Sequence, residues 1–354
     1  MSQWEGSKLM RRRAFLVGFF SLILGLVPLS FGLVAGASTA LADQACWTAG
    51  GSGLTALVVA TSGQTITGTL DATGCDVGVY VGPGVTHVVI RHATIENAND
   101  HGILVQDTSD VQILNNTVTH NDISVHDAIA EDKAISLVGT NHVTVSGNLV
   151  TDNVGSGGIS INDDGPVNPG ALNAGMARPG NYNTVSNNRV FDNHADCGIV
   201  VSAYNPGQGT SHNIIEGNTV SNNVAGIVVA ADPPGTTANN NVVLRNTATD
   251  NAIPGIIVHS NAPGDTVSGT VVMFNVVSGN GADGEIGLTH PTGIVLAGTS
   301  FGPNGPPTTY VTNTVVMFNV ISNEHYGVAK VNTQHSVVFE LGLNHATVPV
   351  YTAP

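Results

Sequence analysis

Short apolar strings separated by Asn and Gly run through most of the chain. One string has the form Gly-Ile-x-Val, and in each copy every second side chain is apolar. It reads GILVQ (102–106), AISLV (134–138), GISIN (158–162), GIVVS (198–202), GIVVA (226–230), GIIVH (255–259), GIVLA (293–297) and GVAKV (327–331). A period of two residues predicts short strands with one face toward a core. No segment after residue 42 has a convincing helical period.

A second repeat, V-x-x-x-N-x-V, lies between these strings. Its Asn falls at 116, 148, 188, 218, 246, 275 and 319, and another Asn follows five residues later at 121, 153, 193, 223, 251 and 280. Units this short cannot fold singly, so we expect them to stack about 4.8 Å apart. The Ile and Val columns then form the core. The Asn columns form ladders at the corners, where each Asn can tolerate the left-handed conformation and hydrogen-bond the turn of the next coil.

This repeat resembles the right-handed parallel β-helix repeat family, within the pectate-lyase-like superfamily, over nearly all of the chain after residue 42. The resemblance implies an all-β solenoid, for which we expect about eight or nine coils. It would form a single domain at 43–354, with an N-terminal cap region at 43–85. The fold hosts pectate lyases, polygalacturonases, alginate lyases and epimerases, phage tailspikes and a periplasmic copper-site maturation protein. The resemblance therefore implies a habit of glycan binding, but no particular reaction.

The first residues resemble an export signal. Arg11, Arg12 and Arg13 precede an apolar run at 14–37, and the small-residue string TALA ends at Ala42. We expect a signal peptide at 1–42 and a secreted, periplasmic or cell-surface protein. The string RRAFL also resembles a twin-arginine signal. The run is long enough to span a bilayer, so an uncleaved anchor is the alternative. Beyond this segment we expect no membrane contact.

The chain without residues 1–42 is strongly acidic. It keeps 6 Lys and Arg against 24 Asp and Glu, a net charge of −18. Nucleic-acid binding needs a basic face, so this class of partner is excluded. Cations are the small partners that this charge favours.

Three cysteines remain after residue 42. In an oxidising exterior Cys46 and Cys75 are expected to form a disulfide near the new N-terminus. Cys197 is left over, and we interpret it as a buried thiol that fills a core position.

Stacking also predicts where polar side chains gather. In Gly-Ile-x-Val the x positions face outward, so loops beside this strip would wall a groove. At the trailing edge, where the strands end, the candidate catalytic residues are Asp163, Asp164, Asp232 and His259. The candidate substrate-binding residues there are Asn162, Ser202, Tyr204, Asn261 and Arg178. Asp164 and Asp232 would lie about 9.6 Å apart, as acid and base, with His259 assisting.

The doubled Asp has two other interpretations. Asp163 and Asp164 precede Gly165 and Pro166, which is good turn chemistry. The two carboxylates could instead hold Ca²⁺, the one cofactor that we consider. His259 could equally be a hydrogen-bonded surface histidine.

A second polar cluster is expected at the leading edge, where the strands begin. It comprises Asp100, His101, Asp132, Lys133, Asp196 and Cys197, with His126, Asp127 and Glu131 in the adjoining loop. Lys133 and Arg178 are the only candidates near the groove for a basic proton abstractor. The Gly-His-Gly and Arg-x-Lys of polygalacturonases and the Asp-Pro-His of alginate epimerases are absent. The 13 His are scattered without tight ligand spacing, which disfavours a transition-metal site.

The leading hypothesis is an exported β-helix protein that binds a polysaccharide along the outward strip. A hydrolase, lyase or epimerase activity stays open, because no single motif selects one. The alternatives are a non-enzymatic metal-handling protein and a structural or adhesive solenoid.

Overall fold

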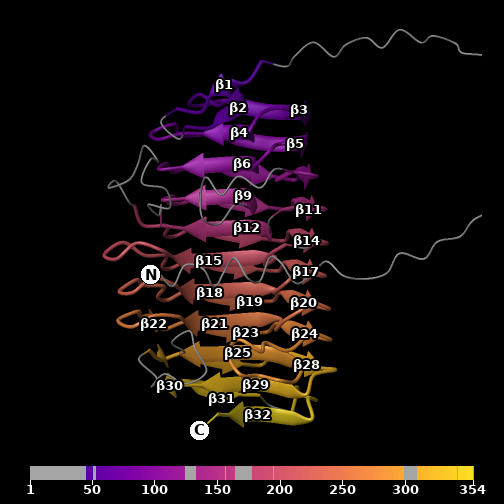
Figure 1. Ribbon diagram of the computed structural model, residues 1–354, viewed down its shortest axis with the longest axis vertical. Coiled ribbons are helices and arrows are strands. Elements are labelled where there is room, and N and C mark those ends of the chain that lie inside the picture. Colours follow the sequence, from indigo (N-terminus) through magenta and orange to yellow (C-terminus); the bar gives the residue numbers. More distant parts are fainter. Residues whose placement is uncertain are drawn as a thin grey trace, which may run out of the picture. The chain divides into compact units, whose positions relative to one another are not determined.

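The computed structural model describes residues 45–50, 53–123, 133–155, 157–163, 178–193, 195–298, 309–340 and 342–353. Every regular element in these ranges is a β-strand. The same ranges therefore contain no helix long and apolar enough to cross a membrane. Residues from 44 onward form one compact unit of stacked coils (Figure 1).

A twelve-stranded sheet runs along one side of this unit. Its strands, in spatial order, are β1 (Trp47–Thr48), β2 (Thr55–Val59), β4 (Val77–Val81), β6 (His101–Gln106), β9 (Lys133–Val138), β12 (Gly157–Asn162), β15 (Ile199–Ala203), β18 (Ile227–Ala231), β21 (Ile256–Ser260), β25 (Thr292–Gly298), β29 (Tyr326–Val331) and β32 (Val348–Thr352). All neighbours pair in parallel except β1, which is antiparallel to β2.

A seventeen-stranded sheet supplies the other two faces of each coil. The strands of its first face are β3 (Thr65–Asp71), β5 (Val89–Glu96), β7 (Gln112–Leu114), β10 (Thr144–Ser146), β13 (Thr184–Ser186), β16 (Ile214–Glu216), β19 (Val242–Leu244), β23 (Val271–Met273), β27 (Val315–Met317) and β31 (Val337–Phe339). Those of its second face are β8 (Thr117–Thr119), β11 (Leu149–Thr151), β14 (Arg189–Phe191), β17 (Thr219–Ser221), β20 (Thr247–Thr249), β24 (Val276–Ser278) and β28 (Val320–Ser322). A small third sheet holds β22 (Val267–Ser268), β26 (Val311–Thr312) and β30 (Thr333–Gln334).

The number of coils exceeds the eight or nine expected from the repeat. Eleven parallel strands stack in the twelve-stranded sheet. The eight Gly-Ile-x-Val strings account for β6 to β29, and the three additional strands are β2, β4 and β32. These carry TALVV, VGVYV and VPVYT, which lack the repeat but pair in the same parallel register. Coils therefore begin inside the segment 43–85 that we expected to be a cap.

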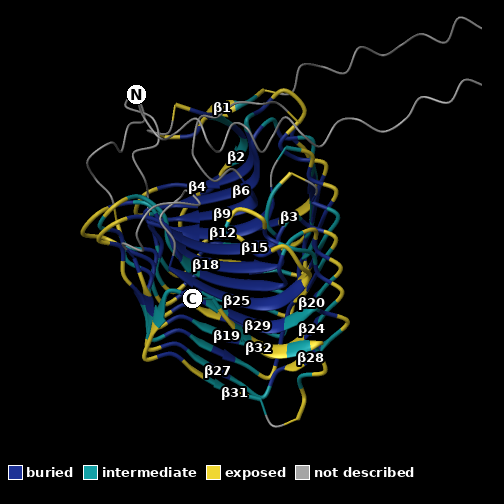
Figure 2. Cartoon of the chain, turned by 60° about the horizontal axis from the view of Figure 1, so that its bottom comes forward, coloured by how far each residue is buried: buried dark blue, intermediate teal, exposed yellow. Residues whose placement is uncertain are grey.

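The core fills the interior of the stacked coils. The second and fourth residues of the Gly-Ile-x-Val strings in β6 to β25 point into it, as in Ile159 and Ile161 of β12, and both are fully buried. In the last string, of β29, Val328 points inward and Lys330 takes the fourth position. The central Val of the short strands points inward as well, as in Val185 and Val190. Figure 2 shows the inner strands of the twelve-stranded sheet, from β4 to β25, largely buried, while the corners and the last strand β32 are more exposed. Burial of about 25 cal/mol per Å² of apolar surface is the main force that holds the coils together.

Two Asn ladders follow the corners at the predicted positions. In the first, the side-chain oxygen of each Asn after Asn116 accepts from the backbone N–H and the amide of the Asn one coil before, and that of Asn116 accepts from the Ala93 N–H. It runs through Asn116, Asn148, Asn188, Asn218, Asn246, Asn275 and Asn319. The second runs through Asn121, Asn153, Asn193, Asn223, Asn251 and Asn280. Each ladder Asn is buried and fully bonded, which avoids the cost of unpaired polar groups.

The ladder Asn do not use the left-handed conformation that they were expected to tolerate. The ladder Asn themselves have negative φ, and the residue just before each one is left-handed. Examples are Asn115 before Asn116, with φ 54°, and Asp152 before Asn153, with φ 56°. A left-handed residue at this point turns the chain and leaves the next side chain directed inward, where the ladder lies. A third, shorter ladder of Asn183, Asn213 and Asn241 was not predicted, because only three coils carry Asn there.

Both long ladders end on a glutamate. Glu324 accepts from the N–H and the amide of Asn280, and Glu340 accepts from the same groups of Asn319. A carboxylate thus serves as the last acceptor where no further Asn follows. Burial raises the pKa of both Glu324 and Glu340.

Candidate functional site

The outward face of the twelve-stranded sheet has three regions. The first apolar cluster covers the early coils and includes Val77, Tyr80, Leu104 and Val138. The second apolar cluster covers the later coils and includes Val200, Val228, Ile257, Val295 and Ala329. Between them lie outward polar side chains that we call the polar centre: His101, Lys133, Ser136, Ser160, Asn162 and Ser202. All six are less than 3% exposed, so the open strip expected from the sequence is not present here.

An ion pair dominates the leading edge of the polar centre. Lys133 extends toward Asp196 two coils away, and its Nζ lies 2.8 Å from the Asp196 Oδ2. The path passes Gly157, where a Cβ would lie only 2.8 Å from the Lys133 Cδ. A larger residue at position 157 would therefore block the path of the Lys133 side chain to Asp196. The Lys133 side chain is 1% exposed and that of Asp196 is 36% exposed, so solvent reaches the pair from the carboxylate side.

Electrostatics keep this ion pair charged. Burial acts to raise the pKa of Asp196, but the Lys133 ammonium and the N–H of Cys197 oppose it and leave that pKa below its ordinary value. The Cys197 N–H donates to the Asp196 Oδ1 over 2.6 Å. Asp196 is thus held by a cation on one oxygen and a backbone donor on the other.

His101 lies beside Lys133 in the same outward column. Its Nδ1 is 3.1 Å from both the Lys133 carbonyl oxygen and the Ser136 Oγ, and Ser160 continues the chain of hydroxyls toward the next coil. Burial lowers the pKa of His101, which favours the neutral imidazole. A neutral histidine next to a charged lysine is a pairing that acid–base chemistry uses, although structural networks also contain it.

The trailing edge gathers several of the predicted residues around Asp232. The Ser202 hydroxyl and the Asn261 amide both donate to its carboxylate. Asn162, Ser202, Ala230 and His259 occupy one column in four successive coils. Tyr204, Asp232 and His259 are half-buried, so this edge is more open than the polar centre. These residues are thus brought together as the register predicted.

Asp163 takes a different position from its predicted partners. It is fully buried, and its carboxylate accepts from the backbone N–H groups of Tyr204, Asn205 and Gly209. The Asn205 amide returns a bond to the Asp163 carbonyl oxygen. This geometry holds the turn at 204–209 of the next coil, and it favours a structural role over acid–base chemistry. Asp164 lies outside the described residues.

The titration of two buried aspartates predicts a pH dependence of stability. Burial raises the pKa of Asp163 and of Asp265 to about 6, from 3.8. The folded state then binds more protons than the unfolded state between about pH 4 and pH 6, so the free energy of unfolding falls as pH rises through this window. For Asp163 the loss is at most roughly 3 kcal/mol.

Urea unfolding at pH 4.5 and pH 7 measures this effect. We expect the wild-type chain to be more stable at pH 4.5, and Asp163→Asn to flatten the difference. Asp110→Asn, at an exposed corner, is the control and should keep the wild-type slope. A stability that is equal or higher at pH 7 would contradict the assignment.

The remaining residues that the sequence singled out do not lie together. Arg178 is 56% exposed, and its Nε lies 3.9 Å from the buried Asp107 Oδ1. Cys46 and Cys75 form a disulfide, the pairing expected from the sequence. Cys197 forms no disulfide, and the expectation of a buried core thiol is wrong, because Cys197 is half-buried and packs on the second apolar cluster at the outward face. Asp132 and the loop residues His126, Asp127 and Glu131 lie outside the described residues. Within the described ranges, no group of three or more His, Cys, Asp or Glu is placed to hold a metal ion.

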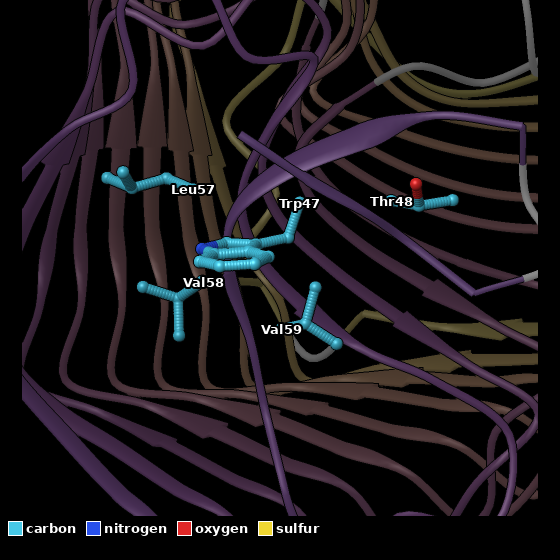
Figure 3. Close-up of a pocket in the computed structure, with 5 residues that line it drawn as sticks. All are labelled: Trp47, Thr48, Leu57, Val58 and Val59. Carbon is cyan, nitrogen blue, oxygen red and sulfur yellow. The ribbon is translucent and has the colours of Figure 1, made fainter. Parts of the chain in front are cut away.

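A hollow of about 560 Å³ lies at the first coil, away from the polar centre and from the trailing-edge residues (Figure 3). It is lined by Trp47, Thr48, Leu57, Val58 and Val59. Four of the five are apolar and none is titratable, so the hollow offers contact area but no acid–base chemistry.

Comparison with known proteins is consistent with this architecture. The family described as "right handed beta helix region" matches residues 49–170 and 168–272. PfbA, a surface adhesin of Streptococcus pneumoniae, superposes with a TM-score of 0.53 and 13% identity, over 79% of this chain and 69% of the adhesin. An alginate lyase from Paenibacillus sp. str. FPU-7 superposes with a TM-score of 0.50 and 14% identity, over 83% of this chain and 92% of the lyase. The search of curated proteins gave no match. At these identities the two structures support the fold alone.

Proposed function

We propose, from the premise that this chain belongs to the right-handed β-helix family, that it is an exported protein that binds a polysaccharide on the outward face of its twelve-stranded sheet. The observation that carries the proposal is the polar centre between two apolar clusters. Burying Lys133, His101 and a row of hydroxyls costs free energy that apolar side chains would not. The same face is apolar in the coils before and after, so the fold itself does not need polar groups there.

The two edges of the polar centre supply the accessible contacts. Asp196 is reachable at the leading edge, and Tyr204, Asp232 and His259 are reachable at the trailing edge. Carboxylate, phenol and imidazole groups of this kind donate to and accept from sugar hydroxyls. The Asp232 carboxylate is held by the Ser202 hydroxyl and the Asn261 amide, and Asn162 occupies the same column as Ser202 and His259. Arg178 lies beside Asp107, which follows β6 at the trailing edge.

A catalytic role for this site is the finer part of the proposal. Asp232, with two donors on its carboxylate, would act with Asp164 as an acid–base pair and His259 would assist. Cleavage and epimerisation both need such groups within reach of one sugar ring. A non-enzymatic adhesin is the second candidate, since a protein of this fold, PfbA, is a surface adhesin.

The test is binding and turnover on a panel of polysaccharides. Asp232→Asn and His259→Ala are expected to weaken binding about tenfold or more if their groups contact the sugar. Thr219→Ala, on an exposed corner of another face, is the matched control. Binding without turnover in the wild type would support the adhesin. Unchanged binding in both variants would exclude the trailing edge as the site.

A further inference from the structure

Four aromatic rings gather at the C-terminal coils, where the outward face of the twelve-stranded sheet ends. The Tyr326 and Tyr351 rings stack with centroids 4.4 Å apart. The His290 and His325 rings stack at 4.2 Å, and both meet the edge of Tyr326, at 5.5 Å and 4.6 Å. We call these four residues the aromatic cluster. They come from three successive coils, whose strands β25, β29 and β32 lie side by side in Figure 1.

The backbone holds the cluster rigidly. The N–H groups of His325 and Tyr326 both donate to the Pro291 carbonyl oxygen, and the Val348 N–H donates to the His325 carbonyl oxygen. Tyr326 and Tyr351 also pack against the second apolar cluster. The rings are thus positioned before any ligand arrives, which lowers the entropy lost on binding.

The outer side of the cluster is accessible. β32 is the last strand of the sheet in the described part of the chain, so no further strand covers the far side of Tyr351. His290 is exposed, and the other three rings are half-buried. No hydrogen bond is found for either tyrosine hydroxyl in the described ranges. Ring surface, phenol groups and imidazole nitrogens are therefore presented together.

This combination points to a sugar ring. An aromatic surface provides apolar contact, while a few polar groups at its border fix the orientation of hydroxyls. A nucleobase would also stack, but a chain with a net charge of −18 after residue 42 repels nucleic acid. No Lys or Arg contacts these rings in the described residues, where the cation found over a ring is Arg189 at Phe191. In the described part of the chain no Lys or Arg is thus found over these rings to pair with a uronate carboxylate, and the basic groups of the four cluster residues are the two imidazoles.

We propose that the aromatic cluster of Tyr351, Tyr326, His290 and His325 is a subsite for a neutral sugar residue. The proposal rests on the proposed glycan-binding function and adds a place and a sugar class to it. Cys197, just before β15, and Tyr326, at the start of β29, both pack on the second apolar cluster. Four strand spacings separate β15 from β29, a distance of about 19 Å along the sheet. A glycan lying along the coils would thus extend from Asp196, at the accessible leading edge of the polar centre, to the aromatic cluster.

Isothermal titration of the chain without residues 1–42 tests this proposal. The ligands are neutral gluco-, manno- and xylo-oligosaccharides, together with uronate oligosaccharides of equal length. Tyr351→Ala should weaken binding of the preferred neutral oligosaccharide about tenfold or more. Tyr351→Leu keeps apolar bulk against the second apolar cluster and should weaken it similarly, whereas Tyr351→Phe should have a smaller effect. Tyr182→Ala removes an exposed ring from the stack with His142 and His212 at another corner, and should bind like the wild type.

The outcomes separate this proposal from the proposed function. Equal binding by wild type and Tyr351→Leu, with binding lost in Asp232→Asn, would overturn the subsite and leave the function standing. Preference for uronate over neutral oligosaccharides would overturn the sugar class. Loss of binding in Tyr351→Leu, with wild-type binding in Asp232→Asn and His259→Ala, would support the subsite and refute the site at the trailing edge. A wild-type chain that binds neither panel would refute both proposals.

Discussion

Asn218→Ala is expected to lower the free energy of unfolding by about 3–5 kcal/mol, among the largest effects of any single substitution in this chain. The Asn218 amide donates to the Val185 carbonyl oxygen and to Asn246, and its oxygen accepts from the N–H and the amide of Asn188. Alanine removes all of these bonds at once. The groups of Asn188, Val185 and Asn246 that bonded the Asn218 side chain stay buried between coils, where water cannot replace the lost partner.

Urea unfolding followed by circular dichroism measures this effect. Thr219→Ala is the control, because Thr219 is the exposed neighbour of Asn218 and changes stability by roughly 0.5 kcal/mol or less. Asn218→Asp loses the amide donor and directs a buried carboxylate oxygen at the Val185 carbonyl and the Asn246 Oδ1, so we expect a cost at least as large. A loss below about 1 kcal/mol for Asn218→Ala would show that the ladder contributes little beyond the core.

The ladders and the core could be predicted because they repeat. Stacking converts a repeat in sequence into a column in space, so the position of Asn218 followed from that of Asn188. The coils at β2, β4 and β32 were missed for the same reason. Strings such as TALVV and VPVYT form equally good strands but carry no Gly-Ile signature.

The polar centre was only partly predictable. Simple alternation places Lys133 on the same side as Ile135, toward the core. A Cβ on Gly102 would meet Val118 and Asn121, and Ala134 and Ile135 are both in the core. Two consecutive residues therefore face inward at the start of each strand, and the residue before them faces outward. This shift carries His101 and Lys133 to the outward face, and the repeat does not reveal it.

The aromatic cluster was missed for a different reason. His290 and His325 lie at corners outside the Gly-Ile-x-Val strings, and Tyr351 lies in the last strand, which lacks the string. The low aromatic content of the whole chain argued against a sugar platform, since aromatic residues make up 5% of it. Composition averages over the chain, whereas stacking brings the few rings together.

Asp196→Asn is expected to destabilise the chain more than Lys133→Met. The Lys133 side chain is 1% exposed, so removing its partner leaves a buried charge without compensation, which costs about 3–5 kcal/mol. Asp196 is 36% exposed, and water can solvate its carboxylate after Lys133→Met. We therefore expect about half that loss for Lys133→Met. Because the pKa of Asp196 is lowered, the ion pair should persist at pH 4.5, and the difference between the two variants should persist with it.

The double variant Lys133→Met with Asp196→Asn distinguishes a structural from a functional ion pair. It leaves no unpaired charge, so we expect it to recover most of the stability lost by Asp196→Asn alone. If Asp196 at the accessible leading edge contacts the polysaccharide, the same variant should still bind about tenfold or more weakly, because the carboxylate is not restored. Urea unfolding and titration with the polysaccharide preferred by the wild type give the two readouts. Recovery of both stability and binding would mean that Lys133 and Asp196 only hold the coils together.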